Sequence, residues 1–229
     1  MATLKLIERT ATHRLIPAKY GAASVLESLP LPAEVLSNLS ELDAATNQRK
    51  IIEKGGTGPI GLGELLIGVP EAHIVNAAFT HSGPFGGRFH GPQRGAWYAG
   101  FEIGTSVAEV AFHKRRFLED ARILGRHAFD YIDFLADFSG SFHALDLAEE
   151  GTCLQPDPVP QCYAPSQALA NGLLFQGSLG IVYPSVRRPS GTCIACFRPA
   201  LVSHPRRDQK YRLTVEAGVD AVETLPIKE

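Results

Sequence analysis

Hydrophobic and polar residues alternate with helical spacing in two parts of the chain. Apolar residues recur every three or four positions in residues 33–53 and again in residues 104–122, which predicts two amphipathic helices. The apolar stripe of the second helix consists of Val107, Val110, Ala111 and Leu118. Thr105 or Ser106 can cap this helix, and Glu109 has the spacing of a capping box with Ser106.

Other segments have strand-like patterns and are separated by turns. Residues 96–101 (AWYAGF) and 128–147 predict strands, and residues 179–199 predict a hairpin around the turn RRPSG. A further helix is predicted over residues 163–177, and the glycine-rich residues 55–68 predict a loop with a strand near its end. Because strands and helices follow one another without a regular βαβ repeat, we expect an α+β fold with a mixed, largely antiparallel sheet and flanking helices.

The length and composition of the chain are typical of a single globular domain, which we assign to residues 1–229. Hydrophobic residues make up 45% and charged residues 20% of 229 residues, and the net charge is −2. This charge provides no overall basic field for binding nucleic acid. No apolar run approaches the roughly 20 residues that span a bilayer, and the first residues lack the apolar core of a signal peptide. We therefore expect a cytoplasmic protein without membrane or direct nucleic-acid contacts.

The four cysteines, Cys153, Cys162, Cys193 and Cys196, include one C-x-x-C spacing in the sequence CIAC. A zinc site would need a second pair of similar spacing, whereas Cys153 and Cys162 are nine positions apart. Residues 192–197 read as a strand, on which positions three apart point to opposite faces. The expectation is therefore reduced structural thiols, with no bound metal.

The segment from Gly86 to Gly100, GGRFHGPQRGAWYAG, combines five glycines with two arginines and the only tryptophan. Such a segment can be a turn that leads into a strand. Alternatively, glycines that allow close backbone approach and arginines that bind anions can form a ligand-binding loop. The sequence pattern alone leaves both interpretations open.

Two general kinds of catalytic site are also conceivable. Ser166 and Ser185 are candidate nucleophiles of a serine hydrolase, but neither lies in a G-x-S-x-G motif. Glu109 and His113 are four apart on one helix and could share a metal ion, but the motif H-E-x-x-H is missing.

A more specific indication comes from four motifs in order: RLIP at 14–17, FTHSGPFGGRFHG at 79–91, WYAGFEIGTSVAEVAFH at 97–113, and YAPSQALANGLLFQGSLGIVYPSVRRPSGTCIACFRP at 163–199. Together they resemble the RES-domain family over about residues 14–199. The resemblance implies a toxin of a bacterial toxin–antitoxin pair with an ADP-ribosyltransferase-like fold. It implies cleavage of the nicotinamide–ribose bond of NAD⁺, with water or phosphate as acceptor. NAD⁺ is then a substrate and no cofactor is expected.

The implied partner is an antitoxin with an Xre-like helix-turn-helix region, and homo-oligomer formation is left open. Transfer of ADP-ribose to a macromolecule and a non-catalytic nucleotide- or partner-binding module are the alternatives.

The resemblance also implies roles for individual residues. The glutamate and serine of the family fall on Glu109 and Ser185, and the arginine of the glycine-rich motif falls on Arg88. A carboxylate at position 109 can stabilise positive charge at the ribose carbon, while Ser185 binds the ribose or fixes the glutamate. Arg88 and the backbone at Gly87 would hold the pyrophosphate, and Tyr98 would offer its ring or hydroxyl to the substrate.

The chain departs from the family pattern at two places. The arginine near the N-terminus falls on Arg14, but Lys19, followed by Tyr20, can also occupy the position of a family arginine. His90 stands where a small polar residue is expected. We include Arg14, Lys19 and Tyr20 among the candidate binding residues.

Overall fold

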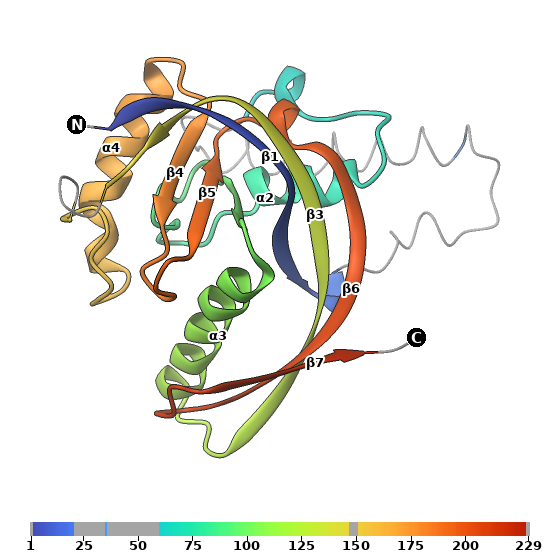
Figure 1. Cartoon of the computed structure of the whole chain (residues 1–229), viewed down its shortest axis with the longest axis vertical. Coiled ribbons are helices and arrows are strands. Elements are labelled where there is room, and N and C mark those ends of the chain that lie inside the picture. The colour runs from blue at the N-terminus through green and yellow to red at the C-terminus, as the bar shows by residue number, and fades with distance from the viewer. Residues whose placement is uncertain (1, 21–34, 36–59, 147–150, 228–229) are drawn as a thin grey trace.

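A computed structural model describes residues 2–20, 35, 60–146 and 151–227 (Figure 1). Apart from Val35, the helix expected over residues 33–53 lies outside the described residues. The strands are β1 (Thr3–Pro17), β2 (Trp97–Gly100), β3 (Arg126–Ala144), β4 (Gly180–Pro184), β5 (Thr192–Cys196), β6 (Ser203–Glu216) and β7 (Val222–Ile227). The helices are α2 (Ala72–Thr80), α3 (Ile103–Asp120) and α4 (Ala164–Phe175), with 3₁₀ turns η1 (Ala18–Tyr20), η2 (Leu62–Glu64), η3 (Gln161–Tyr163) and η4 (Pro199–Leu201).

All seven strands form one mixed sheet in the order β1-β2-β5-β4-β3-β6-β7. Every pairing is antiparallel except that between β3 and β4. Because β1 also pairs with β3, the pairings of the first five strands in this order close on themselves. This arrangement confirms the expected α+β class with a largely antiparallel sheet.

Strand β3 joins the closed set of the first five strands to β6 and β7. Over its 19 residues it pairs with β1 and β6, and near its end with β4. Figure 1 shows β1, β3 and β6 as long curved strands with α3 beneath their arch. Helix α3 packs there because Val107 joins a buried cluster with Leu15 of β1, Tyr131 of β3 and Leu213 of β6.

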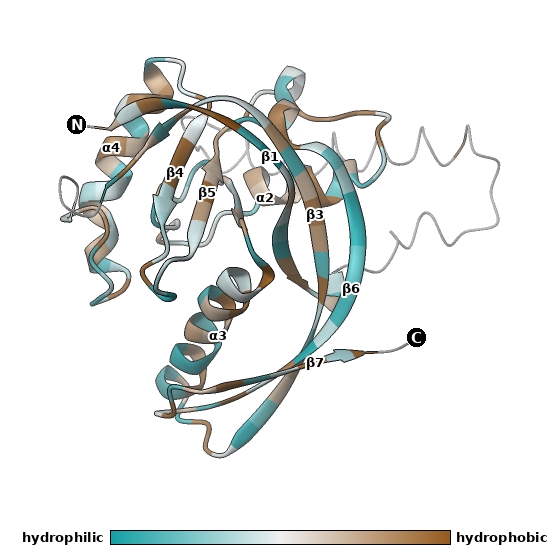
Figure 2. Ribbon diagram, viewed as in Figure 1, coloured by the Kyte–Doolittle hydropathy of each residue, from teal (hydrophilic) through white to brown (hydrophobic). Residues whose placement is uncertain are grey.

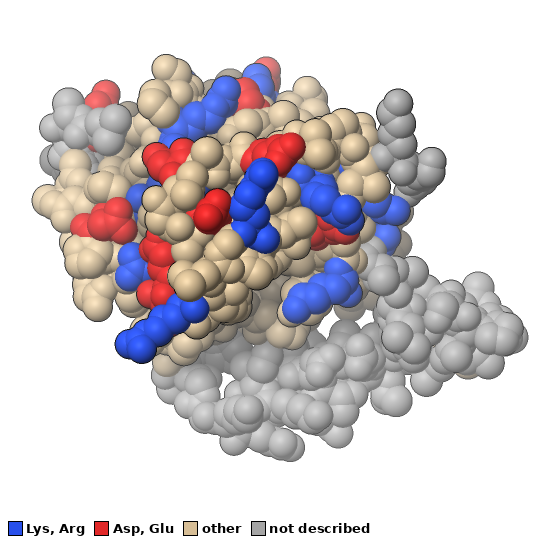
Figure 3. Space-filling view, turned by 90° about the horizontal axis from the view of Figure 1, so that it is seen from below, with Lys and Arg blue, Asp and Glu red and all other residues tan. Residues whose placement is uncertain are grey.

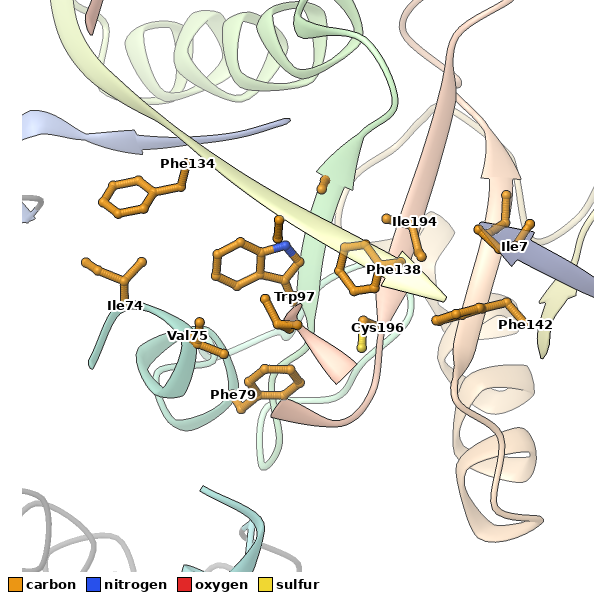
Figure 4. Close-up of a cluster of buried hydrophobic side chains, with 14 of the residues drawn as sticks. Ile7, Ile74, Val75, Phe79, Trp97, Phe134, Phe138, Phe142, Ile194 and Cys196 are labelled. Atoms are coloured by element: carbon orange, nitrogen blue, oxygen red, sulfur yellow. The ribbon is translucent and has the colours of Figure 1, made fainter. Parts of the chain in front are cut away.

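The largest hydrophobic cluster lies where α2, β2 and β3 meet. Trp97 of β2 is fully buried and packs with Phe79 of α2 (Figure 4). Phe134, Phe138 and Phe142 of β3 join this cluster, because alternate residues of a strand lie on one face. Figure 2 shows hydrophobic residues along β4 and β5, whereas α3 carries both hydrophobic and hydrophilic residues. The burial of Trp97 in this core therefore fixes the position of β2, the strand that leads into α3.

The start of α3 differs from the expected capping box. The helix begins at Ile103, and its N-cap, Glu102, makes no side-chain cap hydrogen bond. The Ser106 hydroxyl instead donates to the carbonyl of His13 (2.7 Å) and accepts from the amide of Gly100 (3.1 Å). Ser106 thus joins α3 to β1 and β2, and Glu109 is free of a capping role.

The other expected elements have mixed outcomes. The strands at 96–101 and 128–147, the helix at 163–177 and the hairpin at 179–199 are confirmed as β2, β3, α4 and β4–β5. The strand expected near the end of 55–68 is wrong for the described part, which forms only η2.

Candidate functional site

Glu109 and Ser185 meet between α3 and the end of β4. The Ser185 hydroxyl donates to Oε1 of Glu109 at 2.7 Å. The Ser185 amide donates to the carbonyl of Gly191 (2.8 Å) across the β4–β5 loop, which fixes the backbone. The hydroxyl oxygen also accepts from the amides of Arg187 and Arg188, each at 3.1 Å. Ser185 therefore acts on Glu109 as an oriented donor.

The Glu109 carboxyl group has an unusual electrostatic environment. Burial raises its pKa, and the Ser185 hydrogen bond and the positive charges of Arg187 and Arg88 oppose this rise. The Cys193 thiol also donates to Oε1, at 3.9 Å. Both donors bind Oε1. Among the described residues, Oε2 has no hydrogen-bond partner. One oxygen is thus held by the protein while the other is available to a ligand.

Arg88 lies in the glycine-rich segment and is only 7% exposed. Its Nη1 donates to the carbonyls of Cys153 (3.1 Å) and Gln155 (2.9 Å), and its Cζ lies 5.0 Å from the centre of the Tyr163 ring. In the described part of the chain, Nε and Nη2 make no hydrogen bond. Arg88 therefore keeps an unused pair of donors next to the Glu109 site.

Two further arginines hold the segment that Arg88 contacts. Arg187 donates to the carbonyl of Pro156 (2.5 Å) and lies 3.4 Å from Asp157, with its guanidinium 3.3 Å above the ring of Phe112. Arg116 donates to the carbonyl of Val159 (2.7 Å). Residues 153–159 thus cover one side of the site, and the sequence analysis missed both Arg187 and this covering segment. The only signal was the position of Arg187 two residues after Ser185.

Tyr98 is also near Arg88, but its hydroxyl group is occupied. The hydroxyl accepts from the amide of Phe89 (2.8 Å) and lies 2.9 Å from Nδ1 of His90. Burial and the charge of Arg14 lower the pKa of His90 to about 4, so the imidazole is neutral near pH 7. The arrangement that satisfies both groups has the Tyr98 hydroxyl donating to Nδ1. Only the ring of Tyr98 then remains for a ligand.

Gly87 has a packing role in the same place. A Cβ at this position would lie 2.5 Å from Cε1 of His90 and 3.2 Å from the Tyr98 hydroxyl oxygen. Its carbonyl accepts from the Gln167 side chain (2.9 Å), which ties the loop to α4. The glycine therefore leaves room for the pair of His90 and Tyr98.

The structure separates the N-terminal candidates. Arg14 donates to the carbonyl of Tyr98 (3.0 Å) and stacks 4.8 Å from the centre of the Trp97 ring, and burial lowers its pKa to about 10. It is still charged near pH 7. Lys19 and Tyr20 are exposed and contact each other, with Nζ 4.7 Å from the ring centre. None of their contacts reaches Glu109.

The structure also describes the residues of the serine-hydrolase and metal interpretations. The Ser166 hydroxyl donates to the carbonyl of Tyr163 within the first turn of α4, and no histidine bonds to Ser166 or Ser185 among the described residues. Over residues 2–20, 60–146 and 151–227, no group of three or more histidine, cysteine or acidic side chains could hold a metal ion. Cys193 and Cys196 lie on β5 and belong to different hydrophobic clusters, as their spacing predicts.

The surface charges are mixed. Figure 3 shows basic and acidic side chains interspersed on the face seen from below. Several exposed charges form ion pairs, including Arg126 with Glu223 (2.6 Å) and Arg212 with Asp130 (2.7 Å). Within the described segments, no helix is long and apolar enough to cross a membrane.

The family model described as the RES domain matches residues 66–216, and the chain therefore belongs to the RES-domain family. Arg14, Lys19 and Tyr20 lie before the matched residues, whereas Arg88, Glu109 and Ser185 lie within them. No curated protein matches the sequence. A solved structure, that of the M. tuberculosis MbcT–MbcA toxin–antitoxin complex, is similar with 13% identity and a TM-score of 0.44. The similarity covers 90% of this chain and 85% of the other.

Proposed function

We propose that this RES-domain protein cleaves the nicotinamide–ribose bond of NAD⁺ and acts as the toxin of a toxin–antitoxin pair. The observation that carries the proposal is the Glu109 carboxyl group, which Ser185 holds by one oxygen beside the unused donors of Arg88. The family resemblance implies NAD⁺ as the substrate, and this geometry supports the proposal because it has a carboxyl group and anion-binding donors close together.

The chemistry of NAD⁺ fits the groups present. Nicotinamide leaves as a neutral molecule, so a general acid is not needed. The main barrier is positive charge at the ribose carbon, as in other glycosidic cleavages. The Glu109 carboxylate can stabilise this charge through Oε2 and orient the acceptor, which is water or phosphate. The free donors of Arg88 can bind the pyrophosphate with charge-assisted hydrogen bonds.

The central test compares nicotinamide release by the wild type and the Glu109→Gln variant. Glutamine keeps the size of the side chain and can still accept from Ser185, but it has no negative charge. We expect turnover to fall about 10²-fold or more, while NAD⁺ binding measured by calorimetry persists. Glu119→Gln on the same helix is the matched control, because its amide oxygen can still accept from the Gly218 amide. Near wild-type release by Glu109→Gln would refute the proposed role of the carboxylate.

The toxin role has its own test. We propose, as the family resemblance implies, that an antitoxin with an Xre-like helix-turn-helix region suppresses the activity. Expression of the chain alone should stop growth and lower cellular NAD⁺, and co-expression of the antitoxin encoded beside it should restore both. Growth arrest that persists in the Glu109→Gln variant would separate toxicity from NAD⁺ cleavage.

A further inference from the structure

We propose that the hydroxyl group of Tyr163 binds the nicotinamide-side ribose and contributes to the cleavage step. This inference rests on the proposed function and adds a substrate contact that the sequence motifs did not indicate.

The backbone at Tyr163 is fixed where η3 leads into α4. Its amide donates to the carbonyl of Pro160 (3.0 Å), and its carbonyl accepts from the Ser166 hydroxyl (2.9 Å). The residue is 7% exposed, and its ring lies against the guanidinium of Arg88. The position of the ring is therefore well determined by contacts on two sides.

The hydroxyl group of this buried side chain has no hydrogen-bond partner among the described residues. The hydroxyl oxygen itself is not fully buried, so it borders the site at a point that a ligand can reach. Burial raises the pKa of Tyr163, and the charges of Arg88, Arg187 and Glu109 all act on it. The hydroxyl is therefore protonated near pH 7 and lies among the charged groups of the site.

Tyr98 provides the contrast. It also lies beside Arg88, but its hydroxyl already contacts the amide of Phe89 and the ring of His90. A substrate would have to displace a protein group to reach it. Of the two tyrosines, only Tyr163 has a hydroxyl that can bind a ligand without such a loss.

The ribose is the part of NAD⁺ that this hydroxyl would meet. If Glu109 faces the reacting carbon and Arg88 holds the pyrophosphate, the ribose lies between them. Hydrogen bonds to the hydroxyl next to the reacting carbon strengthen as the glycosidic bond breaks. We therefore expect Tyr163 to bind the 2′-hydroxyl and to affect the cleavage rate more than substrate affinity.

The test is the Tyr163→Phe variant, which removes only the hydroxyl. We expect kcat for NAD⁺ to fall about tenfold or more, with KM and the melting temperature nearly unchanged. For an NAD⁺ analogue without the 2′-hydroxyl on the nicotinamide-side ribose, the variant and the wild type should react at similar rates. Tyr211→Phe, which changes a tyrosine of β6, is the matched control and should leave both rates unchanged.

The outcomes separate this inference from the proposed function. If Tyr163→Phe cleaves NAD⁺ like the wild type while Glu109→Gln is inactive, the inference is wrong and the proposed function stands. An equal rate loss with NAD⁺ and with the analogue would also overturn the ribose contact. A wild-type protein that releases no nicotinamide would overturn both.

Discussion

The Ser185→Ala variant tests whether the serine controls the charge of Glu109. Ser185 is only 8% exposed, and its hydroxyl group donates a 2.7 Å hydrogen bond to the carboxyl group. Hydrogen bonds to charged groups contribute about 1.5–3 kcal/mol, and 1.4 kcal/mol corresponds to a factor of ten. Removing the hydroxyl should therefore raise the pKa of Glu109 beyond the increase that burial already causes. The amides of Arg187 and Arg188 also lose their acceptor, so we expect a loss of about 1–3 kcal/mol in stability.

The assay is the pH dependence of nicotinamide release. The ionised carboxylate is the active form, so activity is present above the pKa of Glu109 and falls as the pH drops through it. In Ser185→Ala this acid limb should move to higher pH, with about a tenfold lower rate on the limb. Ser185→Thr, which keeps a hydroxyl, should retain more of the wild-type profile. An unchanged acid limb in the alanine variant would refute the reasoning, even if the rate at the optimum were lower.

Three other predictions concern single side chains. Arg88→Lys removes the planar guanidinium group, which can bind two backbone carbonyls and a ligand at the same time. KM for NAD⁺ should therefore rise about tenfold. Gly87→Ala should lower the melting temperature, because its Cβ would lie 2.5 Å from the imidazole carbon of the histidine three residues later. Gly91→Ala, in open space, should leave it unchanged. His13→Ala removes the 2.6 Å partner of the fully buried Asp133 and should cost about 3 kcal/mol in urea unfolding, partly restored by adding Asp133→Asn.

The sequence predicted the elements whose own pattern is strong and missed those that depend on distant partners. Strand β2 and helix α3 have clear local periodicity and were found. Strand β6 is rich in charged residues and forms because it pairs with β3, for example through Arg212 and Asp130 across 82 positions. Helix α2 has only nine residues, too few for a clear apolar stripe.

The candidate site shows the same limit. The family resemblance identified Glu109, Ser185 and Arg88, and the structure places these three side chains around one site. The contact of Arg187 with Pro156 and that of Tyr163 with Arg88 join residues that are far apart in the sequence, and no local spacing encodes them. The contacts of Arg14 with Tyr98 and Trp97 likewise depend on the pairing of β1 with β2, which no local spacing encodes.

The pairing of β1 with β3 also has a consequence for the synthesis of the chain. Thr12 bonds to Ala136, 124 positions later, so β1 leaves the ribosome long before its partner. At about 5–20 residues per second, the interval is roughly 6–25 s. During this time the exposed Leu4 and Leu6 belong to an unpaired strand. Ser185 emerges later still, so its hydrogen bond to Glu109 can form only after residue 185 has been synthesised.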